Sequence, residues 1–283
     1  MTFVAARVVD PASGRVVLGA DTKATYYDDT TKTLRDLSEP LQKVVILSDD
    51  VVAGVAGDDP ERTVQRLYEL RNRSLDDVLN EMVRFTAYRK ASRSVLIAKR
   101  GPDPVIVTIV NGALDDRTTT GLGMIGDPRA TREFNRLFKQ DLTGMPGEER
   151  RFVGSLLSLI TLGIVDSVGG FIAAVAGDSA YTFRFQAHQG GVGPWRTNAA
   201  LLPDRRTLRI TVPPGGDPTS HKRIILPGQW PTYRAVAFLI PEAGIAWLHT
   251  HDEPWSGAIR IPGSQPEEVL EIARRSHNQV LRA

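Results

Sequence analysis

The chain of 283 residues has no cysteine, little surplus charge and no long apolar run. The absence of cysteine excludes disulfides, thiolate catalysis and cysteine-ligated zinc sites. The formal net charge of +2 is too small for a dedicated nucleic-acid binder, which needs surplus cations to displace counterions from phosphates. The most apolar stretch, Phe152 to Val168, carries Ser, Thr, Gly and Asp, so no membrane span is expected.

The amino terminus also lacks a basic leader followed by an apolar run, so we expect no secretion signal and a cytoplasmic protein. Internal repeats and low-complexity tracts are absent as well. Hydrophobic residues make up 41% of the chain and charged residues 24%, which allows a large core and does not indicate disorder. The length suits one large domain, or a domain with a sizeable appendage.

The order of predicted strands and helices indicates an α+β protein. Phe3–Val9 and Arg15–Ala20 flank a run of turn residues, which predicts a hairpin, and capping residues at Asp59 and Ser74 predict two helix starts. Further strands are expected at Lys43–Ser48, Val51–Ala56, Ser94–Ala98, Val105–Val110, Phe171–Ala176 and Ala180–Gln186, and further helices at Pro128–Lys139 and Gly147–Val165. Helices segregated from hairpin-built strands favour a layered α+β domain, and this order is compatible with a four-layer αββα sandwich.

The amino-acid composition changes near Gln189, where Pro and Gly become frequent. We therefore expect a first domain over residues 1–186 and a β-rich C-terminal extension over residues 187–283. The extension contains strand candidates at Thr207–Val212, Ala235–Ile240 and Gly244–His249, and a terminal helix at Pro266–His277.

Two features of the extension suggest ligands. His249 and His251 would share one face of a strand and could both bind a cation, but no third ligand is evident, so a polar loop is favoured. The four tryptophans all fall in the last third of the chain, where packing in a core or interface is favoured over stacking on a ligand. No metal or cofactor is predicted.

Thr2 is the central candidate for chemistry, provided that Met1 is removed. A threonine hydroxyl needs a nearby base, and an N-terminal threonine carries one in its α-amine, whose reference pKa is about 7.7–8.0. A neighbouring lysine ammonium would lower the pKa of that amine, a carboxylate would hold the lysine, and a backbone N–H would bind the oxyanion. Asp21, Lys43 and Gly57 are candidates for these parts.

The ordered set of Thr2, Ala20-Asp21-x-Lys23-Ala24-Thr25, Lys43 and Ala56-Gly57 resembles the catalytic half of proteasome β-subunits and their bacterial relatives, over about residues 2–186. The resemblance implies the αββα fold of N-terminal nucleophile (Ntn) hydrolases. It implies that Thr2 attacks a peptide carbonyl and that Asp21 and Lys43 adjust the reactivity of Thr2. It also implies that the Gly57 amide forms the oxyanion hole.

The same resemblance implies roles for further residues. Thr25 would align the substrate backbone, and Asp166 would belong to the catalytic group. Val45, Val55 and Asp59 would border the acyl side chain of the substrate, where an acidic Asp59 would favour basic residues.

Two positions depart from the family pattern, and both concern the proton relay. Gly169 occupies the place of a serine three residues after Asp166, and Ser167 nearby is expected to point elsewhere. Asp127 stands where the family has a second serine, before its third helix.

The expected function is therefore hydrolysis of a peptide or amide bond through an acyl-enzyme on Thr2, in a homo-oligomeric ring that uses no cofactor. An ATPase partner is not identified by the sequence. One alternative is a small-molecule amidase or acylase with the same nucleophile. Another is a non-catalytic scaffold or binding subunit, which Gly169 and Asp127 would support. In that case Lys43 could be a solvated lysine at a strand end, and Asp21 a turn residue.

Overall fold

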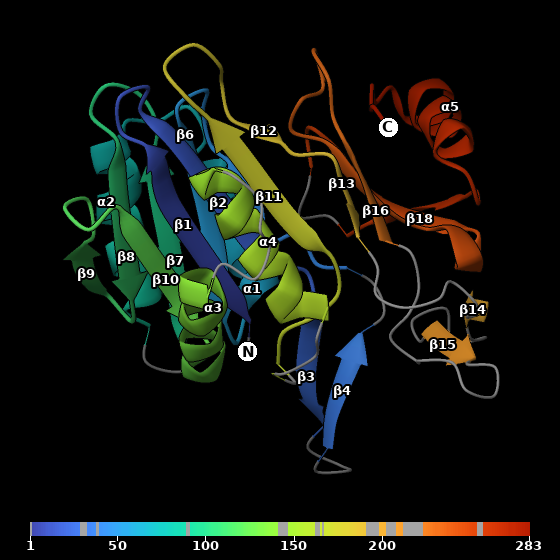
Figure 1. Ribbon diagram of the computed structural model, residues 1–283, viewed down its shortest axis with the longest axis horizontal. Coiled ribbons are helices and arrows are strands. Elements are labelled where there is room, and N and C mark those ends of the chain that lie inside the picture. Colours follow the sequence, from blue (N-terminus) through green and yellow to red (C-terminus); the bar gives the residue numbers. More distant parts are fainter. Residues whose placement is uncertain are drawn as a thin grey trace. The chain divides into compact units, whose positions relative to one another are not determined.

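The structure is a computed structural model that describes residues 2–28, 33–37, 40–88, 91–140, 147–161, 165, 167–190, 198–201, 208–211, 223–253 and 257–283. These residues form three five-stranded antiparallel sheets, two two-stranded sheets and five α-helices (Figure 1). The expectation of a mixed α+β protein is confirmed. Within the described ranges, no helix has the length and apolar character needed to cross a membrane.

The chain divides into two compact units that interleave along the sequence. Unit 1 contains Met1–Asp21, Gln42–Val168 and Ile172–Arg184, and unit 2 contains Thr22–Leu41, Gly169–Phe171 and Phe185–Ala283. Unit 2 thus takes in two segments that precede residue 186. Division into domains at 1–186 and 187–283 stays a prediction.

Unit 1 is built on two five-stranded sheets. The first has the order β10-β1-β2-β11-β12, with β1 at Phe3–Asp10, β2 at Arg15–Asp21, β10 at Leu122–Gly126, β11 at Ile172–Gly177 and β12 at Arg184–Phe185. The second has the order β5-β6-β7-β8-β9, with β5 at Val44–Ile46, β6 at Val51–Gly57, β7 at Arg93–Lys99, β8 at Val105–Val110 and β9 at Ala113–Asp116. The predicted hairpin is confirmed by the β1–β2 pairing, and the strands predicted at β5 to β8 are also present, whereas β9 and β10 were not predicted.

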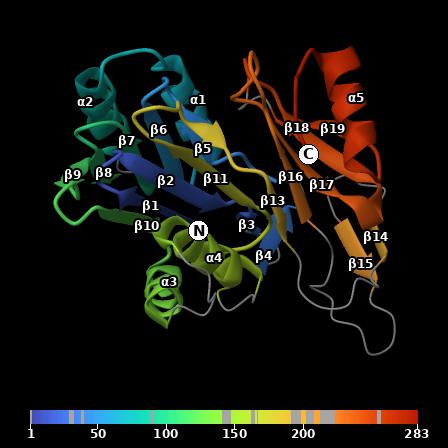
Figure 2. The same cartoon turned by 45° about the horizontal axis from the view of Figure 1, so that its top comes forward.

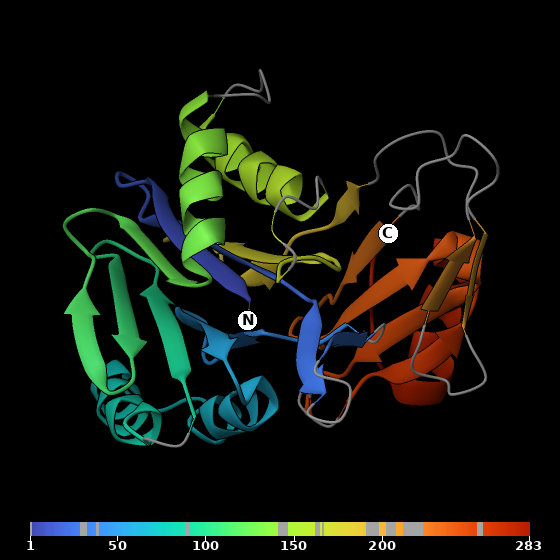
Figure 3. The ribbon, with the colours of Figure 1, turned by 90° about the horizontal axis from the view of Figure 1, so that it is seen from below.

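Four helices cover these sheets, namely α1 at Pro60–Glu69, α2 at Leu75–Thr86, α3 at Pro128–Gln140 and α4 at Glu148–Thr161. Helix α1 contacts β5 and β6, α2 contacts β7 and β8, α3 contacts β10, and α4 contacts β1, β2 and β11. Figure 3 shows α1 and α2 on one side of the unit 1 strands and α3 and α4 on the other. Strand β6 also contacts β1 and β2, so the two sheets pack against each other.

The helix starts follow the local chemistry of the sequence. Ser74 caps α2 by accepting a hydrogen bond from the backbone N–H of Asp77, and Pro60 opens α1 as expected. The side chain of Asp59 makes no capping hydrogen bond and pairs with Arg93 instead, so the predicted cap is wrong at this residue. Helix α4 covers Glu148–Thr161 of the predicted span Gly147–Val165, of which residues 162–164 lie outside the described residues. Phe134 of α3 packs against Phe3 and Phe152, with ring centroids 5.4 Å apart in both pairs, which fixes α3 and α4 on the start of β1.

Unit 2 contains the third five-stranded sheet and the terminal helix α5 at Pro266–His277, as predicted (Figure 2). The sheet order is β13-β16-β17-β18-β19, with β13 at His188–Gly190, β16 at Arg223–Pro227, β17 at Val236–Ile240, β18 at Ile245–His249 and β19 at Ile259–Pro262. Two small sheets pair β3 at Ala24–Asp28 with β4 at Thr33–Leu37, and β14 at Asn198–Leu201 with β15 at Leu208–Thr211. Leu226, Leu239 and Leu248 share a buried cluster with Val269 and Ala273 of α5.

Candidate active site

The β1–β2 hairpin brings Thr2 and Asp21 together. Val4 lies opposite Ala20, so the residue before β1 and the last residue of β2 share one end of the hairpin. The backbone N–H of Phe3 donates to Asp21 Oδ1 at 2.9 Å, and the Thr2 hydroxyl donates to the same oxygen. The hairpin therefore places the candidate nucleophile and its carboxylate at the same end of the first sheet, where the two hydrogen bonds join them.

Lys43 reaches this contact from the second sheet. It directly precedes β5, and its carbonyl accepts a hydrogen bond of 2.9 Å from the N–H of Val55 in β6. Strands β5 and β6 both contact β2, which brings the start of β5 toward the end of the hairpin. Lys43 Nζ donates to Thr2 Oγ1 and lies 3.2 Å from Asp21 Oδ1. Thr2, Asp21 and Lys43 thus form one hydrogen-bonded cluster.

The cluster is withdrawn from solvent. Asp21 is 0% exposed, Lys43 1% and Thr2 3%. The interpretation of Lys43 as a solvated strand-end lysine is therefore wrong. Desolvating a carboxylate and an ammonium costs several kcal/mol for each ion, and a packed apolar cluster would avoid that cost. Buried charges of this kind concentrate at functional sites, so the burial favours a chemical role.

Gly57 lies at the end of β6, opposite Arg93. Its φ of 125° falls where side chains are rarely tolerated, and a Cβ there would lie 2.1 Å from the carbonyl oxygen of Ser92. It follows Val55, the residue that bonds to Lys43, by two positions along the strand. The geometry therefore requires glycine here and places it on the strand that supports Lys43.

The residues expected to border the substrate side chain lie on β5, β6 and the turn into α1. Val45 and Val55 are buried, and Val45 pairs with Ala53. Asp59 forms an ion pair of 3.0 Å with Arg93, whose side chain is only 4% exposed. Because this pair compensates the charge of Asp59, the electrostatic reason to expect basic substrates is weakened.

The roles expected of Asp166 and Thr25 stay predictions. Asp166 lies outside the described residues. Thr25 lies in β3 of unit 2, opposite Asp36, and its side chain is also outside the described part of the structure.

Asp127, which directly follows β10 and stands where the family has a serine, makes contacts beside Thr2 that the sequence did not predict. The backbone N–H of Asp127 donates to the carbonyl of Thr2 at 2.8 Å, and the hydroxyl of Ser167 donates to Asp127 Oδ2 at 2.5 Å. Ser167 thus points to Asp127. Gly126, with φ 107°, permits the close approach, since a Cβ there would lie 1.9 Å from the carbonyl oxygen of Thr2.

The carboxyl group of Asp127 is held as a carboxylate. Burial raises its pKa, but hydrogen bonds from Ser167 and from the backbone N–H of Arg129 and Ala130 lower it, together with the charge of Arg129, and the net pKa is below the ordinary value. The Arg129 N–H lies 2.8 Å from Oδ1. The buried carboxylate of Asp127 therefore belongs to a residue that is hydrogen-bonded to Thr2, the candidate nucleophile.

His249 and His251, the histidines considered as metal ligands, both contact backbone groups. His249 Nε2 lies 3.1 Å from the carbonyl oxygen of Pro40, and the N–H of Arg234 donates to His251 Nδ1 at 3.2 Å. Across the described ranges, no group of three or more His, Asp or Glu side chains is arranged to hold a metal ion. Trp247 is fully buried beside Phe171, as expected of a core tryptophan.

The chain matches no protein-family model and no curated protein.

Proposed function

We propose that this chain is a threonine-type Ntn hydrolase, which cleaves a peptide or amide bond through an acyl-enzyme on Thr2 after Met1 is removed. The observation that carries the proposal is the buried contact of Thr2 Oγ1 with both Lys43 Nζ and Asp21 Oδ1. A surface threonine would need neither a buried cation nor a buried anion. Here both converge on one hydroxyl.

The proposed reaction begins when loss of Met1 turns the Thr2 nitrogen from an amide into a basic amine. The neutral amine accepts the Oγ1 proton as the oxygen attacks the substrate carbonyl. The Lys43 ammonium stabilises the negative charge that develops on Oγ1, and Asp21 holds Lys43 and the backbone of Phe3 in place. The amine then gives its proton to the leaving amine, and water hydrolyses the ester.

The other expected residues have proposed roles around Thr2. The conformation of Gly57 and its place on β6 suit an exposed N–H for the oxyanion. Val45, Val55, Thr25 and Asp166 keep their proposed roles in substrate binding and catalysis. The pairs of helices on opposite sides of two packed sheets support a four-layer αββα sandwich for unit 1.

The hydrolysis test compares Thr2→Ala with Thr108→Ala, a matched change at another buried threonine in unit 1. Purified protein whose amino-terminal residue is Thr2 should cleave short amides or peptides, Thr2→Ala should lose all measurable turnover, and Thr108→Ala should retain it. Cleavage of short amides but not peptides would support the amidase alternative. Full activity in Thr2→Ala would refute the mechanism, and Met1 retained in protein purified from cells would support the scaffold alternative.

We further propose that the protein assembles into a homo-oligomeric ring, as the resemblance to proteasome subunits implies. Size-exclusion chromatography with light scattering measures the mass of the assembly. A clean monomer would refute the ring without affecting the proposed chemistry of Thr2.

A further inference from the structure

A segment of unit 2 lies between the two charged residues of the candidate site in the sequence. This segment, Thr22–Leu41, follows Asp21 directly and ends two residues before Lys43. The proton transfers described above use no residue of unit 2. Because the chain is continuous, however, the ends of this segment set where the chain leaves Asp21 and where it enters Lys43.

The two ends of the segment are hydrogen-bonded to each other and to Phe171. The N–H of Leu41 donates to the carbonyl of Thr22 at 2.9 Å. Thr22 is fully buried, its N–H donates to the carbonyl of Phe171 at 3.0 Å, and its hydroxyl accepts from the N–H of Phe171 at 2.8 Å. The chain next to Asp21 is thus fixed by backbone groups of unit 2.

His249 holds the other end, at the residue before Leu41. Its Nε2 lies 3.1 Å from the carbonyl oxygen of Pro40, and a carbonyl oxygen only accepts, so Nε2 is the donor. His249 is the last residue of β18 and is 2% exposed. Its ring packs T-shaped against Phe238 of the paired strand β17, with centroids 5.8 Å apart. The donor is therefore held rigidly within the third sheet.

We propose that His249 is a positioning residue, which fixes Pro40 and thereby the point at which the chain brings Lys43 to Thr2. This inference rests on the proposed function. Only two residues separate Pro40 from Lys43, so a shift of the Pro40 carbonyl is passed on to the lysine. The carbonyl of Lys43 is bonded to the N–H of Val55, which fixes the residue from its other side.

The position of the Lys43 ammonium matters because reacting groups must be held within about 0.5 Å of their productive geometry. A displacement of Nζ from Thr2 Oγ1 would weaken the stabilisation of the developing charge, while leaving the substrate pocket in place. The expected signature is therefore a loss in the maximal rate and not in the affinity for the reagent.

The test is the concentration dependence of Thr2 acylation by a β-lactone, measured by mass spectrometry on protein that begins at Thr2. His249→Phe keeps a packed ring and removes the donor. It should lower the maximal rate by about tenfold, with less than about a twofold change in the β-lactone concentration that gives half of that rate. His249→Leu replaces it if the larger ring prevents folding. His249→Gln keeps an N–H donor and should stay within about threefold of wild type.

His251→Phe is the matched control. His251 also contacts a backbone group, accepting from the N–H of Arg234 at 3.2 Å, and its ring also packs T-shaped against an aromatic ring, that of Tyr233. Its partners do not lie on the chain that enters Lys43. His251→Phe should therefore leave the maximal rate within about twofold of wild type.

Hydrogen exchange gives a second measurement that does not depend on any chemistry at Thr2. The peptide that covers residues 40–43 should exchange faster in His249→Phe than in wild type and His249→Gln, because Pro40 is released. An unchanged exchange rate, or an unchanged maximal acylation rate in a folded variant without the donor, overturns this inference alone. So does an equal loss of acylation in His249→Gln. Absence of acylation in the wild type overturns the proposed function.

Discussion

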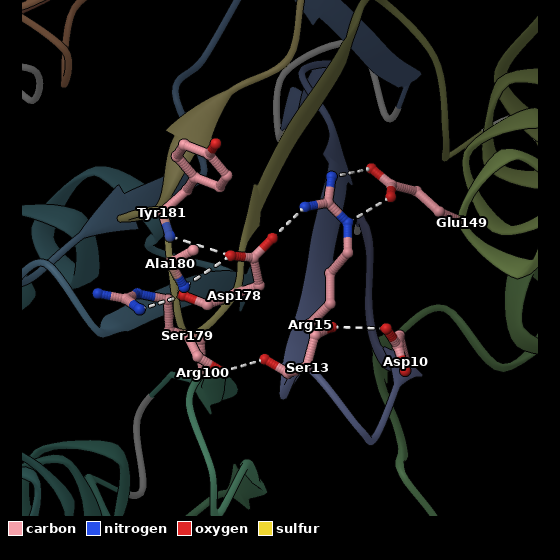
Figure 4. A network of polar contacts seen from close by, with 9 residues as sticks. All are labelled: Asp10, Ser13, Arg15, Arg100, Glu149, Asp178, Ser179, Ala180 and Tyr181. Atoms are coloured by element: carbon pink, nitrogen blue, oxygen red, sulfur yellow. Dashed lines mark hydrogen bonds and ion pairs between the residues drawn. The ribbon is translucent and has the colours of Figure 1, made fainter.

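Strand β2 carries an ionic cluster at each end, and the two clusters differ in exposure. At its first residue, Arg15 pairs with Glu149 at 2.6 Å and with Asp178 at 2.7 Å, and these side chains are 13–29% exposed (Figure 4). At its last residue, Asp21 pairs with Lys43 at 3.2 Å, and neither side chain is more than 2% exposed. The first cluster keeps contact with water, while the second has lost it.

The Arg15 cluster has the form of a structural clamp. Asp178 also accepts hydrogen bonds of 2.9 Å from the N–H groups of Ala180 and Tyr181, and Arg100 donates to its carbonyl (Figure 4). The clamp joins β2, α4 and the turn after β11, and it satisfies the charges that it contains. The Lys43 cluster instead directs both of its charges at a hydroxyl, which a structural role does not require.

The largest expected effect comes from removing the buried cation. Lys43→Met should lower the rate of Thr2 acylation on the order of 10²–10⁴-fold, because Oγ1 loses its ammonium partner. It should also lower the free energy of unfolding by about 3–5 kcal/mol, because Asp21 is left buried without it. Acylation kinetics and urea unfolding measure the two effects. A variant that acylates at the wild-type rate would contradict the role of Lys43.

Removing both buried charges should separate stability from chemistry. The double variant Asp21→Asn/Lys43→Met should recover to within about 1 kcal/mol of the wild-type stability, since neither charge is then left alone. Its acylation rate should stay as low as that of Lys43→Met. Strictly additive destabilisation by the two single changes in a double-mutant cycle would show that the charges do not interact as the geometry implies.

The clamp at the other end of β2 should behave in the opposite way. Arg15→Met should cost about 1–2 kcal/mol of unfolding free energy, because two ion pairs are lost at partly exposed positions. The acylation rate should stay within about twofold of wild type. Arg136→Met, in an exposed pair with Glu133, serves as the control and should cost about 0.5 kcal/mol or less. A large loss of the acylation rate in Arg15→Met would show that the Arg15 cluster also affects the chemistry of Thr2, and would contradict its purely structural role.

The smallest effect is the pH dependence of the clamp. Burial raises the pKa of Asp178, but backbone N–H groups and Arg15 lower it, and the net pKa lies below the unfolded value of 3.8. A lowered folded pKa stabilises the protein above that value, and the contribution is lost as the pH falls through the folded pKa. The stability difference between wild type and Asp178→Asn should thus be constant near neutral pH and shrink below about pH 4. A stability difference between wild type and Asp178→Asn that grows as the pH falls would contradict a lowered pKa for Asp178.

Much of the fold follows from local sequence patterns. The sequence predicted the start of α1 at Pro60, the Ser74 cap and the whole of α5. Helix capping and the spacing of apolar residues each depend on a few residues that are close together in the sequence. Strand β10 was missed because its five residues include two glycines and bury only Gly123 and Ile125. A short apolar run between Gly121 and Gly126 was the available signal.

The site was predictable only in part. Thr2 and Asp21 lie at the same end of the first sheet because of the β1–β2 hairpin, which local sequence sets. The approach of Lys43 depends on how two sheets pack, and only the resemblance to a known family suggested it. The Asp127–Ser167 contact joins residues 40 positions apart through an unpredicted strand, so no local rule could have found it.

The most direct test of the account is to map the residue modified by a threonine-directed electrophile. After treatment with a β-lactone, peptide mass spectrometry should find one adduct, on Thr2, in chains that have lost Met1. An adduct on another residue would contradict the account. So would the absence of any adduct in protein shown to begin at Thr2.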